Sequence, residues 1–180
     1  MLPEAQGHFA AKVNQFSAAD VAAILRERGW LRFETEDVAA WLKDVAVLVG
    51  PHAADRAALA GLLLLVFEYD ARSVIASREC QEVLARDGSR EVVRVLASEI
   101  LSGGPVDSAR LKEIVTALKT GLPYSSREIF LALRVALTGR VGAGVLDRIV
   151  LLLDRAAGTD GLSPVKSVRA RILEFCSVLD

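Results

Sequence analysis

A single arginine, Arg134, lies inside the otherwise apolar stretch 130–137, and a glycine, Gly139, follows that stretch closely. A guanidinium group keeps its proton at ordinary pH, so it is rarely left unpaired beside an apolar core. Arg134 must therefore reach water, pair with a carboxylate such as Asp147, or bind a phosphate or base edge of a ligand.

More arginines follow toward the C-terminus, and they admit two interpretations. In the first, they line one face as a phosphate-binding cluster in which Arg134 reads a base edge. In the second, Arg134 pairs with an acid such as Asp147 and the other arginines lie on solvated helix faces. The residues alone favour the second interpretation. The four further arginines concerned are Arg140, Arg148, Arg169 and Arg171.

The residue types give little support for catalysis or for metal binding. The sequence has no G-x-S-x-G, Walker or HExxH motif, so no enzymatic activity is expected. The only histidines, His8 and His52, are far apart, and Cys80 and Cys176 form no CxxC motif. We therefore expect free thiols, no metal site and no cofactor.

Composition and charge indicate a helical protein without a membrane span. Hydrophobic residues make up 52% of the 180 residues but aromatic residues only 6%, and the net charge is −1. The longest strongly apolar run, 62–67, is too short to cross a bilayer, and no secretory signal is visible at the N-terminus. We expect a cytoplasmic location. Residues 101–180 carry eleven basic and eight acidic side chains, which makes this part mildly basic.

The apolar residues recur at helical spacing, and no stretch alternates with the period of a strand. The sequence thus predicts an all-α, compact multi-helix bundle of eight or nine helices, in which 1–16 form a loose arm or a short helix. The glycines and proline at 103–105 suggest a boundary between helical subdomains 17–104 and 105–180. The expected helices are 17–28, 35–49, 54–69, 71–86, 89–101, 107–120, 126–137, 145–153 and 163–179.

The string Leu-Arg-Val-Ala-Leu-Thr-Gly-Arg at 133–140 resembles a motif of the C-terminal anticodon-binding region of bacterial glutamyl-tRNA synthetases. That family has Pro-Leu-Arg-x-Ala-Leu-Thr-Gly, a short turn, a leucine-rich helix and a final Arg-Leu pair. The turn at 143–146, the leucine-rich stretch 149–153 and Arg171-Ile172 match these parts in order. The resemblance is clear over 112–153 and extends less closely to 62–70.

The resemblance implies a tRNA-binding helical module whose contacts with anticodon bases are made by Arg134 and Leu146. The synthetase catalytic domain is missing, so we expect no aminoacylation by this chain; it would bind tRNA or assist a synthetase. Three departures, Ala132, Gly144 and Asp154, surround the implied anticodon surface. They support the alternative of a protein-interaction or structural domain that kept the fold and lost RNA binding.

Overall fold

The computed structural model describes residues 15–179, and within them helices joined by short loops make up the fold. The expected all-α class is confirmed: the described part has ten α-helices, no strand, and one isolated bridge between Leu31 and Leu162. The helices are α1 (Ala18–Glu27), α2 (Glu36–Leu48), the short 3-10 helix η1 (Gly50–His52), α3 (Arg56–Phe67), α4 (Ala71–Ala76), α5 (Arg78–Leu84), α6 (Ser89–Leu101), α7 (Ser108–Gly121), α8 (Ser126–Thr138), α9 (Val145–Ala157) and α10 (Val168–Leu179).

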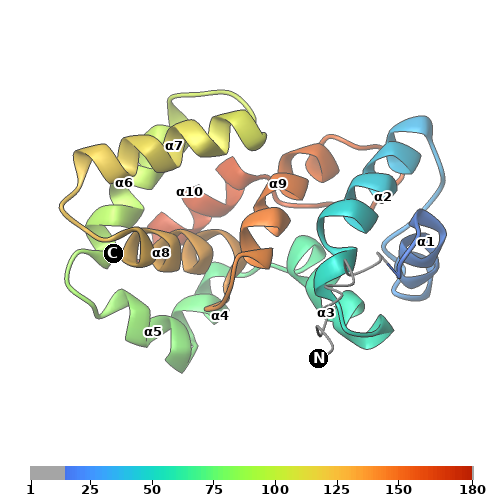
Figure 1. The fold of residues 1–180 in the computed structure, drawn as a ribbon, viewed down its shortest axis with the longest axis horizontal. Helices are drawn as coiled ribbons and strands as arrows, with labels where there is room; N and C mark the ends of the chain where they lie inside the picture. Colours follow the sequence, from blue (N-terminus) through green and yellow to red (C-terminus); the bar gives the residue numbers. More distant parts are fainter. Residues whose placement is uncertain (1–14, 180) are drawn as a thin grey trace, which may run out of the picture.

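The helices form an elongated bundle with α9 near its middle (Figure 1). Helices α1, α2 and α3 lie at one end, and α4 to α8 lie toward the other. Helix α9 packs against α2 and α3 on one side and against α8 on the other. Buried side chains before and after residues 103–105 belong to one continuous core. The division into 17–104 and 105–180 stays a prediction, and most of the expected arm, 1–14, lies outside the described residues.

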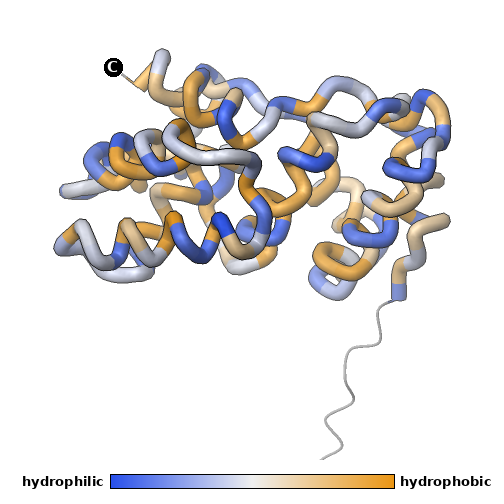
Figure 2. The backbone as a smooth tube through the Cα atoms, turned by 90° about the horizontal axis from the view of Figure 1, so that it is seen from above, coloured by the Kyte–Doolittle hydropathy of each residue, from blue (hydrophilic) through white to orange (hydrophobic). Residues whose placement is uncertain are grey.

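Local sequence signals explain where most helices begin. Short apolar and polar stretches alternate along the tube in Figure 2, as amphipathic helices require. Ser17 and Ser125 each accept a hydrogen bond from the backbone three residues later, and Asp20 and Glu128 complete the two capping boxes. The carboxylate of Glu128 accepts from the Ser125 amide, and the hydrogen bonds with Ser125 lower the pKa of Glu128.

One expected helix, 71–86, is in fact two, because Ser77 adopts an extended conformation with ψ of 130° between α4 and α5. The break lets residues from both short helices contact the end of α8. Val74 of α4 packs at Gly139, and the Cys80 thiol of α5 lies 3.6 Å from the Gly139 carbonyl. Periodicity along one segment contains no information on this tertiary contact.

The last helix begins at Val168 and not at the expected Ser163. Ser163 bonds instead to the loop after α1: its amide donates to the Trp30 carbonyl and its hydroxyl to the Gly29 carbonyl. Asp154 then caps α10, since its carboxylate accepts from the Val168 amide at 2.7 Å and from the amide before α7, that of Val106, at 2.6 Å. One carboxylate thus joins α9, the segment before α7 and the start of α10.

The side chain of Arg171 is fully buried at the point where three helices meet. Its guanidinium donates to the carbonyls of Leu65 and Val66 in the last turn of α3, at 2.9 and 2.6 Å. It also donates to the Leu137 carbonyl, in the last turn of α8, at 2.9 Å. Carbonyls at helix C-termini lack partners within their helix and carry partial negative charge, so they suit a buried cation.

Tyr69 completes this centre with its ring against the guanidinium. The Arg171 Cζ atom lies 4.7 Å from the centroid of the Tyr69 ring, and the Tyr69 hydroxyl donates to the Ala136 carbonyl at 2.5 Å. Burial lowers the pKa of Arg171 to about 10 and raises the pKa of Tyr69. At neutral pH the arginine is therefore charged and the tyrosine neutral.

Arg171→Met should lower the free energy of unfolding by about 3 kcal/mol or more, because each buried carbonyl left without a donor costs ~1–3 kcal/mol. Urea unfolding followed by circular dichroism measures this. Arg169→Met, an exposed position on the same helix, is the matched control and should change stability little. Equal stability of the two variants would contradict the structural role of Arg171.

Candidate functional site

Arg134 is held in a bidentate pair with Asp147. Its Nε and Nη2 atoms each donate to one carboxylate oxygen of Asp147 at 2.8 Å. The side chains are only 15% and 22% exposed, so the pair is largely shielded from water. The pairing interpretation of Arg134 is confirmed, and most of its hydrogen-bonding edge is occupied.

The same arginine fixes the loop between α8 and α9, residues 139–144, which we call the α8–α9 loop. Its remaining terminal nitrogen, Nη1, donates to the Gly142 carbonyl at 2.8 Å. Gly139 begins the loop with φ of +70°, and a Cβ atom there would lie 2.5 Å from a methyl group of Val74. A glycine is therefore required for both backbone conformation and space. Arg134 acts in this structure as the residue that positions the loop.

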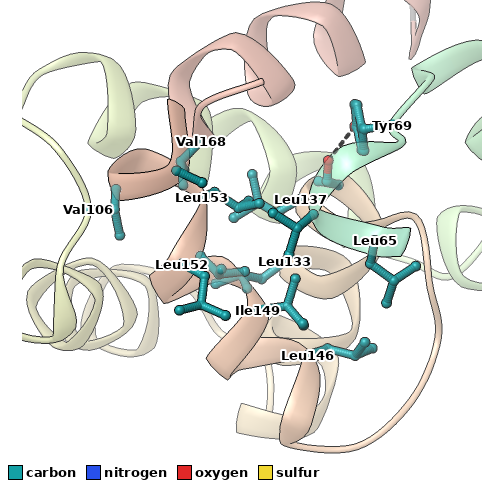
Figure 3. Close-up of a cluster of buried hydrophobic side chains, with 14 of the residues drawn as sticks. Leu65, Tyr69, Val106, Leu133, Leu137, Leu146, Ile149, Leu152, Leu153 and Val168 are labelled. Atoms are coloured by element: carbon teal, nitrogen blue, oxygen red, sulfur yellow. Dashed lines mark hydrogen bonds between the residues drawn. The ribbon is translucent and has the colours of Figure 1, made fainter. Parts of the chain in front are cut away.

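Leu146 does not present its side chain to solvent. It is 5% exposed and lies at the edge of the cluster of buried side chains that includes Leu133 and Ile149 (Figure 3). The contact with a base that the resemblance implies for Leu146 would require this side chain to leave the core. In the structure it anchors the first turn of α9.

Neither interpretation of the arginines holds completely, because Arg171 lies neither on a shared exposed face nor on a solvated helix face. Arg171 was expected among the RNA-facing residues, but its side chain is fully buried. Its guanidinium N–H groups donate to main-chain carbonyls instead. Arg169 is exposed, but its Nη1 donates to the Leu101 carbonyl at 3.1 Å, at the C-terminal end of α6. The sequence could not separate these arginines because their carbonyl partners are main-chain groups, which leave no signature in a sequence.

Two of the expected arginines, Arg140 and Arg148, remain available near the α8–α9 loop. Both are exposed, and their side chains make no hydrogen bond or ion pair with the described residues. Arg140 lies in the loop and borders a hollow of about 540 Å³ with the segment 64–77. Arg148 follows Asp147 in the first turns of α9. Together with the Arg134–Asp147 pair, which holds the loop, they make the α8–α9 loop the candidate site.

The remaining reactive groups of residues 15–179 give no second site. Neither Cys80 nor Cys176 forms a disulfide bond within the described residues, and burial is the main cause that raises the pKa of Cys80. Within the same residues, no group of three or more His, Cys, Asp or Glu side chains is arranged to hold a metal ion. Every helix in this described part is too short or too polar to cross a membrane.

A double-mutant cycle on Arg134→Ala and Asp147→Ala should give a coupling of about 1–2 kcal/mol in the free energy of unfolding, because the pair is bidentate and shielded from water. The exposed pair Arg78–Glu82, with side chains 90% and 62% exposed, is the control and should show little coupling. Additive effects at Arg134 and Asp147 would show that the pair does not stabilise the loop.

Comparison with known proteins finds a similarity to part of a glutamate–tRNA ligase. Over 121 residues, 67% of the chain, the sequence is 27% identical to the glutamate–tRNA ligase of Bacillus cytotoxicus. The chain covers 24% of the length of that ligase. No protein-family model matches the chain. No solved structure matches it either. The similarity to a part of a glutamate–tRNA ligase agrees with the resemblance of the 133–140 motif.

Proposed function

We propose that this chain is a non-catalytic tRNA-binding module related to glutamyl-tRNA synthetases, acting in the cytoplasm by holding a tRNA or by assisting a synthetase. The main support for the proposal is the similarity to a glutamate–tRNA ligase over two thirds of the chain. The motif at 133–140 forms the end of α8 and the start of the α8–α9 loop. This loop is the surface on which we place the RNA.

The exposed arginines favour contacts with phosphates over the reading of bases. Arg140 and Arg148 are exposed and have no ion-pair partner among the described residues. Arg134, in contrast, already donates to Asp147 and Gly142. Phosphate contacts position an RNA without reading its sequence, whereas base contacts provide specificity. We therefore expect weak, salt-sensitive binding with few phosphate contacts and little discrimination between tRNAs.

A second function, a protein-interaction or structural domain without RNA binding, is favoured by a specific observation. The two residues that the resemblance places against anticodon bases both make contacts within the protein. Arg134 pairs with Asp147, and the Leu146 side chain is buried in the core. A module that had lost its RNA ligand would keep such contacts, because they stabilise the fold.

The experiment that separates the two functions is fluorescence anisotropy with labelled tRNA-Glu and a non-cognate tRNA, from about 50 to 200 mM salt. Arg140→Ala/Arg148→Ala should weaken binding of both tRNAs to a similar degree. It should also reduce the slope of log K against log salt by roughly 0.7–0.9 for each phosphate that is no longer neutralised. The physical reason is that fewer counterions are released when fewer cations meet the RNA.

Arg28→Ala/Arg32→Ala is the matched control, because it removes two exposed arginines between α1 and α2 and changes the net charge equally. It should retain the affinity and the salt slope of the wild-type chain. If the wild-type chain binds neither tRNA at low salt, the RNA-binding function is wrong and the protein-interaction alternative stands.

A further inference from the structure

Next to the α8–α9 loop, a lysine of α7 and the arginine of α8 lie over the same aromatic ring. The Lys119 Nζ atom is 5.4 Å from the centroid of the Phe130 ring, and the Arg134 Cζ atom is 5.2 Å from it. Cations over an aromatic face are attracted to the ring by its quadrupole. Lys119 is therefore held at the surface in a defined place, although its side chain is long and exposed.

Helix α8 continues this surface away from the loop. Arg127, Phe130 and Arg134 are spaced i, i+3 and i+7, so they lie along one face of the helix. At 1.5 Å per residue, Arg127 is roughly 10 Å from Arg134 along the helix axis. Lys119 is in the last turn of α7, which packs against α8. The row thus extends from the α8–α9 loop toward the start of α8.

The acidic side chains close in sequence to this row are already bound. Asp147 accepts from Arg134, and Glu113 accepts from Arg110 at 3.1 Å. Glu128 accepts from the Ser125 amide in the capping box of α8. The two remaining cations of the row are exposed and form no hydrogen bond or ion pair with the described residues. The surface therefore has two cations that form no ion pair within the described part of the chain, namely Lys119 and Arg127.

We propose that Lys119 and Arg127 form a phosphate-binding surface on α7 and α8 that holds the backbone of an RNA whose adjoining part reaches the α8–α9 loop. The surface rests on the proposed function and adds to it a second contact area, with residues outside the motif that resembles the synthetases. Phe130 is a positioning residue, since it holds Lys119 in place. An ammonium and a guanidinium both bind phosphate oxygens through charge-assisted hydrogen bonds.

The test compares Lys119→Ala/Arg127→Ala with Lys43→Ala/Arg32→Ala, which removes one exposed lysine and one exposed arginine from α2 and the segment before it. Binding of tRNA-Glu and a non-cognate tRNA is measured by anisotropy across the same salt range. We expect Lys119→Ala/Arg127→Ala to reduce the slope of log K against log salt by about one to two. It should weaken the binding of both tRNAs equally. The control variant should match the wild type, and thermal unfolding by circular dichroism confirms that both are folded.

A further variant, Phe130→Leu, keeps an apolar side chain but removes the ring. It should weaken RNA binding less than the double variant does, because the ammonium remains but is no longer held in place. If Phe130→Leu has the salt slope and the affinity of the wild type, the positioning role is contradicted.

Each remaining outcome decides the proposal. If Lys119→Ala/Arg127→Ala binds like the wild type while Arg140→Ala/Arg148→Ala binds weakly, the additional surface is wrong and the proposed function stands. If Lys43→Ala/Arg32→Ala reduces the salt slope as much as Lys119→Ala/Arg127→Ala does, the effect comes from the change in net charge. The proposed phosphate-binding surface on α7 and α8 is then also wrong. If the wild type binds no RNA but binds poly-glutamate through Lys119 and Arg127, the partner is an acidic protein and both proposals fail.

Discussion

The buried guanidinium of Arg171 is the contact on which the arrangement of the candidate site depends. It joins the C-terminal ends of α3 and α8 through main-chain carbonyls, so it sets where α8 ends relative to the rest of the bundle. The α8–α9 loop starts directly after that end, at Gly139. Two helix ends whose carbonyls would otherwise lack donors are satisfied by one side chain. A charge in the core is costly in general, and here the carbonyls and the Tyr69 ring compensate for the lost water.

A second arginine, Arg134, also connects helix ends through hydrogen bonds, but it lies closer to the surface. Arg134 ties the end of α8 to the first turn of α9 through Asp147 and holds the loop between them through Gly142. Arg134 and Arg171, which match the Pro-Leu-Arg and the final Arg-Leu pair of the synthetases, therefore stabilise the structure. The groups that face solvent around them are Arg140 and Arg148, to which the resemblance assigns no contact with a base. RNA binding, as we propose it, depends on a well-positioned loop with exposed cations around it.

The sequence predicted what depends on local interactions. The all-α class, the starts of the expected helices 17–28 and 126–137, and the Arg134–Asp147 pairing as one of two interpretations all follow from residues near each other in the chain. Prediction failed where the partner is distant or is main chain. The α3 carbonyls that bind Arg171 lie 105 and 106 residues away, and a carbonyl has no signature in a sequence. The break at Ser77 likewise reflects packing against the end of α8.

This division of the arginines into structural and RNA-binding groups can be tested by nuclear magnetic resonance of the arginine Nε–H signals during titration with an anticodon stem-loop RNA. We predict that the signals of Arg140 and Arg148 shift, while those of Arg134 and Arg171 stay in place and exchange slowly with water. A large shift or rapid exchange at Arg134, with Arg140 and Arg148 unchanged, would contradict the division. That result would mean that the pair with Asp147 opens and that Arg134 itself binds the RNA.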